Sequence, residues 1–250
     1  MDKMTLRTQA EQTRRKWGMD STSPIDIFSQ INQVHNVTLV LYPLGENISG
    51  VCIKGPTSSV IAINSTQTLG RQRFSLAHEV YHYYYDKSDH TTVCPTKIDS
   101  GDIEERNADR FASYLLIPHV ALIEQIAFLK KDSEARITVK DVVELEQFFQ
   151  VSRKAMLFRL REENLITQDE SKELEQNVKL SASRLGFELT LYEPRPVNRQ
   201  KTTLGYYIEK AEQLYNDEKI STGKYEEFLL DAFREDMVFG PEDNEEEYVD

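Results

Sequence analysis

The stretch RFSLAHEVYHYYYD, Arg73 to Asp86, decides how the rest of the chain is interpreted. It contains neither Gly nor Pro, so it predicts a helix of about three turns or more. A helix turns 100° per residue, so His78 and His82 lie on one face and both imidazoles can reach one metal ion. Glu79 lies one step around the helix, where a carboxylate can accept a proton from the attacking water. This is the HExxH arrangement of zinc hydrolases.

Two histidines and a base do not complete a catalytic site. With five histidines in 250 residues, the pattern is expected by chance in on the order of one such chain in a hundred. Catalytic zinc normally takes three protein ligands and keeps a further position for water. The chain must therefore supply a third ligand downstream, and the candidates are His90, Cys94, Glu104, Glu105 and His119.

A second amphipathic helix offers the best of these candidates. The stretch DIEERNADRFASYLLIP, residues 102–118, predicts a helix that ends near its proline. In it Glu105 and Asp109 are four residues apart and share a face. Glu105 can ligate the metal while Asp109 accepts a hydrogen bond from the free ring N–H of His78 and fixes its tautomer. The face predicted to be buried consists of Ala108, Phe111, Ala112, Leu115 and Leu116.

Glu105 also has an explanation without metal. Asp102 stands three residues before it, which is the spacing of a helix-capping box. Glu104 points about 100° away from the face of Asp109 and is the reserve ligand. His90 and Cys94 lie in a polar stretch, residues 90–101, that we expect to be a loop.

Composition indicates a folded, soluble protein. With 250 residues and 39% hydrophobic content, the chain can bury the core of a moderate domain with a smaller appendage. It has no apolar run of about 18 residues, and its N-terminus is polar, so we expect a cytoplasmic protein without membrane contact. The net charge of −12 disfavours nucleic-acid binding, although six acids lie in the last nine residues, which we expect to form a solvated tail.

The two cysteines, Cys52 and Cys94, are too few for a disulfide framework. We expect ordinary thiols, and a zinc site made only of cysteines is excluded.

The remaining segments predict short strands and several helices. Residues 1–17 predict a helix, and a second begins with Ser23 as N-cap and Pro24 at its first position. VTLVLY, GVCIK and SVIAIN predict strands, with GPTSS as the turn of a hairpin. Further helices are expected over HVALIEQIAFLKK, as a pair within 139–162 around QVS, and as a pair within 204–237 around STGK.

Two motifs in this order resemble the ImmA/IrrE metallopeptidases. The matching stretches are INSTQTLGRQRFSLAHEVYHYYYD and EERNADRFASYLLIP, which follow the family pattern of Arg-Phe, HExxH, then Glu-x-x-Ala-Asn/Asp-x-Phe-Ala and Leu-Leu-x-Pro. The resemblance covers roughly residues 20–165 and extends more loosely over the C-terminal helices. It implies that His78, His82 and Glu105 bind zinc and that Glu79 is the catalytic base.

The resemblance also implies a fold and a function. The expected α+β fold is a compact gluzincin-like metallopeptidase domain, with a small β-sheet, an active-site helix and a second ligand helix, followed by helix-turn-helix-like and C-terminal helical segments. The expected activity is that of a zinc metallo-endopeptidase that cleaves a helix-turn-helix (XRE-type) repressor, an anti-repressor that derepresses mobile-element or stress genes. We divide the chain into a peptidase domain (1–132), a helix-turn-helix-like segment (133–168), a C-terminal helical region (169–240) and an acidic, disordered tail (241–250).

The helix-turn-helix-like segment is the basis of a second hypothesis. Ser152 is expected to cap its second helix, and Gln150 stands where the turn of such motifs commonly has glycine. Four basic residues without acids in residues 151–161 suit a phosphate-contacting or a solvated face, and direct DNA binding is disfavoured because no larger basic patch supports it. The alternative function is a non-proteolytic regulator that binds a repressor or DNA through residues 142–166 and has a structural metal site. The predicted core consists of Val142, Leu145, Phe148, Phe149, Val151, Ala155, Met156, Leu160 and Leu165.

Overall fold

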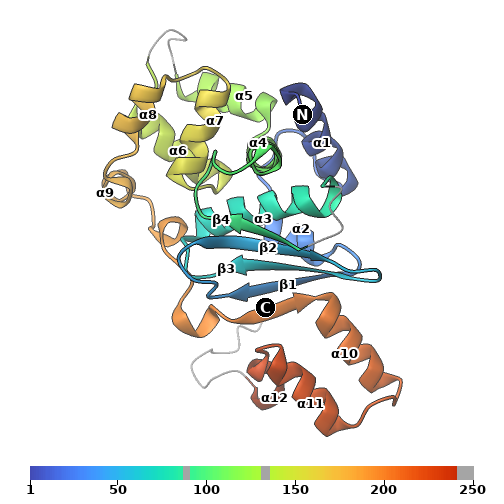
Figure 1. Cartoon of the computed structure of the whole chain (residues 1–250). Helices are drawn as coiled ribbons and strands as arrows, with labels where there is room; N and C mark the ends of the chain where they lie inside the picture. The colour runs from blue at the N-terminus through green and yellow to red at the C-terminus, as the bar shows by residue number, and fades with distance from the viewer. Residues whose placement is uncertain (87–90, 131–135, 241–250) are drawn as a thin grey trace.

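The computed structural model describes residues 1–86, 91–130 and 136–240. Two expectations, the ligand role of His90 and the disorder of the tail 241–250, therefore lie outside the described residues. Within them the chain has the predicted α+β architecture, a small sheet with many helices (Figure 1).

The described residues form five strands, twelve α-helices and two short 3-10 turns. The strands are β1 (Val37–Tyr42), β2 (Ile48–Lys54), β3 (Ser59–Asn64), β4 (Thr92–Pro95) and β5 (Thr202–Gly205). The helices are α1 (Lys3–Lys16), α2 (Ile27–Asn32), α3 (Leu69–Tyr84), α4 (Ile103–Leu116), α5 (His119–Leu129), α6 (Val139–Phe149), α7 (Arg153–Glu162), α8 (Gln168–Leu174), α9 (Val178–Arg184), α10 (Tyr206–Asn216), α11 (Thr222–Asp231) and α12 (Glu235–Phe239). Two short 3-10 turns are η1 (Thr190–Tyr192) and η2 (Val197–Arg199).

The five strands form one mixed sheet in the order β4-β2-β3-β1-β5. β2 and β3 make the predicted antiparallel hairpin, and β1 pairs with β3 in parallel. Helix α3 covers one face of the sheet (Figure 1), because the alternating side chains on that face are apolar. The buried strand residues on this side include Leu39, Leu41, Cys52, Ile61 and Ile63.

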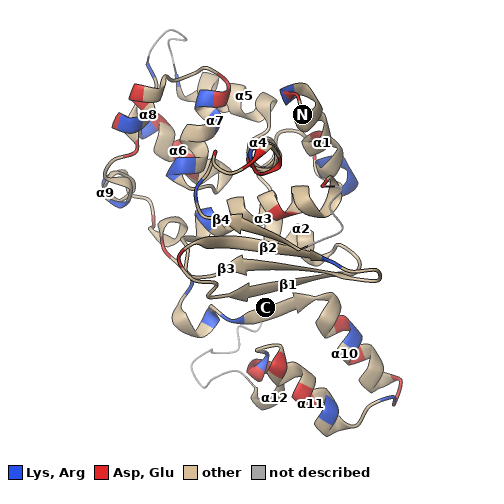
Figure 2. Ribbon diagram, in the orientation of Figure 1, with Lys and Arg blue, Asp and Glu red and all other residues tan. Residues whose placement is uncertain are grey.

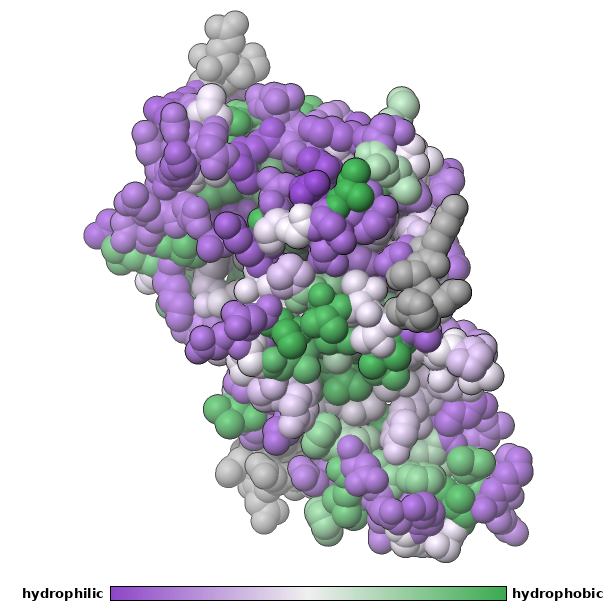
Figure 3. All heavy atoms as spheres, viewed as in Figure 1, coloured by the Kyte–Doolittle hydropathy of each residue, from purple (hydrophilic) through white to green (hydrophobic). Residues whose placement is uncertain are grey.

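The opposite face of the sheet carries an apolar row open to solvent. Strand register places Val93, Val51, Ala62 and Val40 side by side across four strands. Val93 is 53% exposed and Ile53, also on this face, is 43% exposed. Figure 3 shows apolar side chains gathered in the middle of the molecule, over these strands.

Two strands were missed by the sequence analysis. β4 lies inside the expected loop 90–101, and β5 precedes the helices in the region expected to be helical. Both have only four residues and lack a run of apolar side chains. β4 is extended because it pairs with β2, and β5 because it pairs with β1. The strand propensity of a short segment does not predict such contacts between distant parts of the chain.

The second helix begins three residues later than predicted. It starts at Ile27 with Asp26 as N-cap, and not at Pro24 after Ser23. The carboxylate of Asp20 accepts hydrogen bonds from the backbone N–H groups of Thr22 (2.7 Å) and Ser23 (2.6 Å). This local turn holds Ser23 outside the helix.

The helix-turn-helix-like segment belongs to the same hydrophobic core as the sheet and α3. Its predicted core is buried, with Phe148 and Leu165 partly buried at the margin. Gln150 has the left-handed backbone conformation (φ 56°) for which glycine is common at the end of a helix. Ser152 caps α7 as predicted. The domain boundaries stay a prediction.

The remaining described helices complete the two ends of the molecule. α10, α11 and α12 lie beyond β5, on the side of the sheet edge away from α5–α8 (Figure 1). Among the described residues, no single helix is long and apolar enough to cross a membrane. Helices α4 and α5 taken together have the length and composition of a span, but they are bent by 56° relative to each other. The predicted buried face of α4 is fully buried inside the protein.

Candidate metal centre

Helix α3 carries three functional candidates into the interior of the protein. It lies between the sheet and α4, so most of its length is buried. His78 is 6% exposed, His82 1% and Glu79 0%. Burying three ionisable side chains in one turn costs free energy unless each has a compensating partner, so their partners define the site.

Both histidines face one carboxylate on α4. The Nε2 atoms of His78 and His82 lie 3.2 Å apart. Glu105 Oε2 lies 3.3 Å from His78 Nε2, and Glu105 Oε1 lies 3.5 Å from His82 Nε2. The structure thus brings together the three predicted ligands, from two helices that pack against each other.

These separations fit a metal ion. Ligand atoms about 2.0–2.1 Å from a tetrahedral metal lie about 3.3 Å from one another, and the three observed separations span 3.2–3.5 Å. Two imidazoles and a carboxylate are also the donor set of many catalytic zinc sites. His78, His82 and Glu105 therefore suit a divalent transition metal.

The other ring nitrogen of each histidine is held by an aspartate. His78 Nδ1 lies 2.9 Å from Asp109 Oδ1, as predicted. The second oxygen of Asp109 accepts the backbone N–H of Asp99 at 2.6 Å. His82 Nδ1 lies 3.0 Å from Asp86 Oδ2. Each carboxylate directs the opposite nitrogen, Nε2, toward the common centre.

Asp86 was not predicted, although a signal for it was present. It is the last residue of the quoted stretch and stands four residues after His82, the spacing of neighbours on a helix face. The sequence analysis searched for an orienting partner for His78 alone.

The capping explanation of Glu105 accounts for its backbone and not for its side chain. Asp102 caps α4 and accepts the N–H groups of Glu104 (2.9 Å) and Glu105 (3.0 Å). The carboxylate of Glu105 faces His78 and His82. The cap fixes the first turn of the helix, and Glu105 then projects toward α3.

The electrostatics of the cluster favour a protonated His78 beside an ionised Glu105. Burial alone lowers the pKa of His78, but hydrogen bonds to Asp109 and Glu105 outweigh it and raise that pKa to about 10. Burial alone raises the pKa of Glu105, but hydrogen bonds to His78 and His82 lower it to about 2. A metal cation in this position takes over the role of the imidazolium charge.

Glu79 is a buried carboxylate. Neither of its oxygens has a partner at hydrogen-bond distance within the described residues. Burial raises its pKa, and the nearby thiol of Cys94 offsets part of that rise. Its side chain lies against Gly50 of β2, where a Cβ atom would come within 2.9 Å of Glu79 Cδ and closer still to Oε1. Strand β2 can approach the base only because residue 50 is glycine, a requirement that sequence reasoning missed.

Cys94 also lies at the cluster, in contrast to the loop position expected for it. Its Sγ joins the ligand atoms of His78, His82 and Glu105 within 4.8 Å of one another. The thiol donates a hydrogen bond to Glu105 Oε1 at 3.9 Å, and burial together with the charges of Glu79 and Glu105 raises its pKa. Strand β4, which was not predicted, places Cys94 here. Both cysteines are free thiols, as expected.

The other candidate ligands have different partners. Glu104 accepts a hydrogen bond from the hydroxyl of Tyr81 at 2.7 Å, and His119 Nδ1 lies 3.0 Å from Glu163.

The tyrosines after His82 pack the end of α3 against α1. The hydroxyl of Tyr85, for example, forms a hydrogen bond with the hydroxyl of Thr13 (2.9 Å).

The comparisons with known proteins agree with this geometry. Residues 32–161, just over half of the chain, match the family model Peptidase_M78, described as the IrrE N-terminal-like domain. The matched range includes α3, α4 and every residue of the cluster. A comparison with curated proteins found no match.

Proposed function

The chain belongs to the IrrE N-terminal-like (M78) family of metallopeptidases, and from this premise we propose that it is a zinc-dependent endopeptidase that cleaves a helix-turn-helix (XRE-type) repressor. The observation that carries the enzymatic part is the buried carboxylate of Glu79, which has no ion pair or close hydrogen bond within the described parts of the chain, beside three convergent ligand atoms. A metal site that serves only the fold has no use for such a base.

The residues divide the work of peptide hydrolysis among them. His78, His82 and Glu105 hold the metal, which when bound supplies a Lewis acid that polarises the scissile carbonyl and acidifies water. Glu79 accepts a proton from the attacking water and passes it to the leaving amine. Burial, which raises the pKa of Glu79, makes its carboxylate a better proton acceptor. Asp109 and Asp86 keep both imidazoles in the orientation that binding requires.

The sheet supports a peptide as the substrate. β4 forms one edge of the described sheet and carries Cys94 into the cluster. An extended peptide that pairs with such an edge forms main-chain hydrogen bonds irrespective of its sequence. Such a peptide would pass beside the metal ligands, and the exposed Val93 next to Cys94 offers it an apolar contact.

The repressor as substrate and the cytoplasm as location rest on the family resemblance. α6 and α7 support a role in gripping a protein more than in reading DNA. Of the four basic residues there, Arg153 and Arg159 are buried and pair with Glu146 and Glu163. The solvated face expected from the sequence is thus wrong for these two residues.

One observation favours the alternative of a non-proteolytic regulator. Cys94 lies close enough to be considered a fourth ligand, and a four-ligand zinc site is closed to substrate. Against this, Cys94 Sγ lies 3.9 Å from Glu105 Oε1, farther than the three N and O ligands lie from one another. We therefore assign the thiol as a hydrogen-bond donor to Glu105.

The test is a cleavage assay with purified components. We expect the zinc-loaded protein to cut a helix-turn-helix repressor encoded nearby into discrete fragments. Chelation should stop the reaction, and added zinc should restore it. If the repressor binds but stays intact under all metal conditions, the non-proteolytic alternative is the better account.

A further inference from the structure

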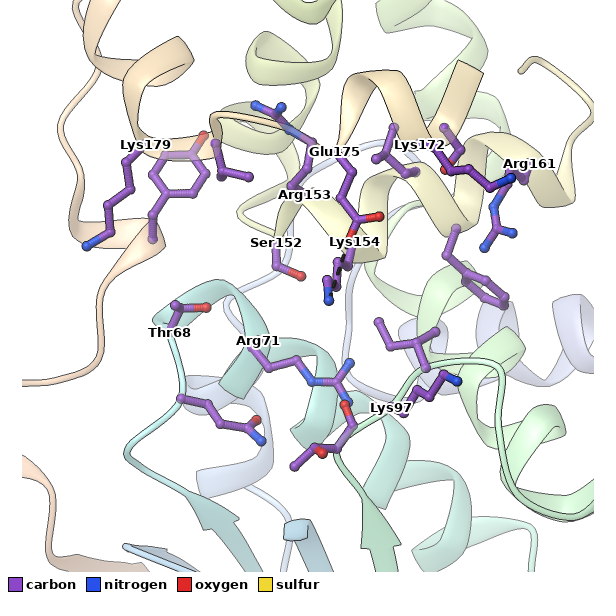
Figure 4. Close-up of a pocket in the computed structure, with 18 of the residues that line it drawn as sticks. Thr68, Arg71, Lys97, Ser152, Arg153, Lys154, Arg161, Lys172, Glu175 and Lys179 are labelled. Atoms are coloured by element: carbon purple, nitrogen blue, oxygen red, sulfur yellow. Dashed lines mark hydrogen bonds and ion pairs between the residues drawn. The ribbon is translucent and has the colours of Figure 1, made fainter. Parts of the chain in front are cut away.

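A large cavity lies apart from the metal centre, between the first turn of α3, the segment that follows β4, and helices α7, α8 and α9 (Figure 4). Its volume is about 710 Å³, within the range of about 300–1,000 Å³ that small-molecule sites occupy. Neither the proposed chemistry nor the predicted helix-turn-helix role uses it.

The cavity wall is strongly basic. Among the described residues that line it, seven are Lys or Arg and one, Glu175, is acidic. Arg71 and Lys97 project from one wall, and Lys154, Lys172 and Arg161 from the other, as Figure 4 shows. In Figure 2, Lys and Arg positions, drawn in blue, recur on the upper helices α6, α7 and α8. In a chain of net charge −12, such a local excess of cations indicates an anionic ligand.

Carboxylates compensate only part of this charge. Four of the seven cations pair with carboxylates: Arg153 with buried Glu146, Lys154 with Glu175, Lys172 with Asp169 and Lys179 with Glu193. Arg71 donates to the carbonyl oxygen of Thr96 at 2.7 Å, a neutral partner. For Lys97 no ion pair is seen within the described part of the chain. Arg161 donates through Nη1 to the side-chain oxygen of Gln168, a neutral partner, and its Nε is buried without a hydrogen bond there.

Two helix N-termini also point to the cavity. Thr68 and Ser152, the N-caps of α3 and α7, both line it. The two ends meet because Gly70 has no side chain: a Cβ there would lie 2.7 Å from Ser152 N. Helix N-termini carry partial positive charge, which favours phosphate. The N–H groups of Leu69 and Ala155 already bond to Glu193 O and Ser152 Oγ, so the contribution here is that of the dipoles.

The floor of the cavity is apolar. It is formed by Ile98, Leu157, Phe158, Val178 and Tyr192. A bare inorganic anion gains nothing from these side chains, whereas a ligand with an organic ring buries it against them. We therefore propose that the cavity binds a phosphorylated small molecule of the nucleotide class, with its phosphates toward Arg71 and Lys97 and its base on the apolar floor.

The cavity is connected to the metal centre through a short segment. Thr96, Lys97 and Ile98 line the cavity, and they join Cys94, at the cluster, to Asp99. The N–H of Asp99 donates to Asp109 at 2.6 Å, and Asp109 holds His78. A ligand that binds Lys97 and Arg71 therefore acts on the groups that orient His78. The nucleotide is an effector of the metal centre; its effect on cleavage rests on the proposed function, whereas its binding does not.

The first experiment measures binding by isothermal titration calorimetry on the full chain. The probes are Mg–ATP, Mg–GTP, AMP, adenosine, inorganic phosphate and a single-stranded DNA oligonucleotide. We expect one nucleotide to bind one site, at least tenfold more tightly than phosphate or adenosine. The proposal is overturned if none of the nucleotides binds at millimolar concentration, if phosphate binds as tightly as they do, or if the oligonucleotide binds more tightly than mononucleotides.

The second experiment uses variants in the cavity wall. Lys97→Gln and Arg161→Gln should each weaken nucleotide binding about tenfold, the loss expected for one charge-assisted contact. Lys97→Arg should retain binding, and Lys224→Gln on α11, an exposed lysine far along the chain, is the matched control. Melting curves check that the variants fold. Unchanged affinity in both cavity variants overturns the assignment.

The third measurement tests the connection. If the cavity and the metal centre are coupled, the nucleotide changes zinc affinity by the same factor as zinc changes nucleotide affinity. A factor of one in both directions overturns the effector role. Because both constants are binding constants, this result does not depend on whether the protein cleaves a repressor.

Discussion

Gly50→Ala offers a quantitative test of how the base is positioned. An added Cβ would lie 2.9 Å from Glu79 Cδ, whereas ordinary contacts begin at 3.4 Å, so the carboxylate must retreat by about 0.5 Å or more. Glu79 is fully buried and has no space to move without disturbing its neighbours. Overpacking of this kind costs about 1–3 kcal/mol, which lowers the melting temperature by about 2–12 °C.

The same displacement should impair catalysis more than metal binding. Misplacing a catalytic group by about 1 Å costs roughly 100-fold in rate, and the three atoms nearest to the added methyl group all belong to Glu79. We therefore expect Gly50→Ala to bind zinc as tightly as the unmodified protein and to cleave at least tenfold more slowly. Calorimetry and a cleavage time course measure the two effects separately.

A double-mutant cycle identifies the cause. In a Glu79→Ala background the colliding atoms are gone, so Gly50→Ala should be nearly neutral or slightly stabilising. Gly223→Ala on α11, where an added Cβ meets nothing within 4 Å, is the control for glycine replacement. The reasoning is refuted if Gly50→Ala costs the same in both backgrounds.

Three further predictions concern the surroundings of the site. The pKa of His78 is raised from 6.5 to about 10, so the stabilisation from its charged form is complete below about pH 6.5 and is lost as the pH rises toward 10. The melting temperature of protein prepared without metal should therefore fall across this range, and it should fall less in Asp109→Asn. If Cys94 only donates to Glu105, the Co²⁺-loaded protein should lack intense thiolate charge-transfer absorption, and the presence of that band would indicate a closed, four-ligand site. Glu146→Ala leaves buried Arg153 without its carboxylate and should cost about 3–5 kcal/mol in denaturant unfolding.

The sequence alone predicted what local pattern encodes. HExxH and Glu-x-x-x-Asp lie on helices, where spacing determines which side chains share a face, and the structure brings His78, His82, Glu105 and Asp109 together. The hairpin and the buried face of α4 were predicted for the same reason, since periodicity reports burial directly.

The missed features depend on contacts between distant segments. Cys94 reaches the cluster because β4 pairs with β2, and Gly50 matters because that strand passes over Glu79. Arg153 and Arg159 appeared to be surface residues, because a sequence does not show that they pair with Glu146 and Glu163. The basic cavity likewise gathers residues from five separate elements.

The central claim is that Glu79 is the base of a metal-dependent peptidase. Its most direct test is the Glu79→Gln variant, loaded with zinc and incubated with the repressor. Gln preserves the size of the side chain and cannot accept the proton, so we predict zinc affinity and melting temperature close to those of the unmodified protein together with complete loss of the cleavage fragments. Repressor fragments formed at an undiminished rate by this variant would contradict the account.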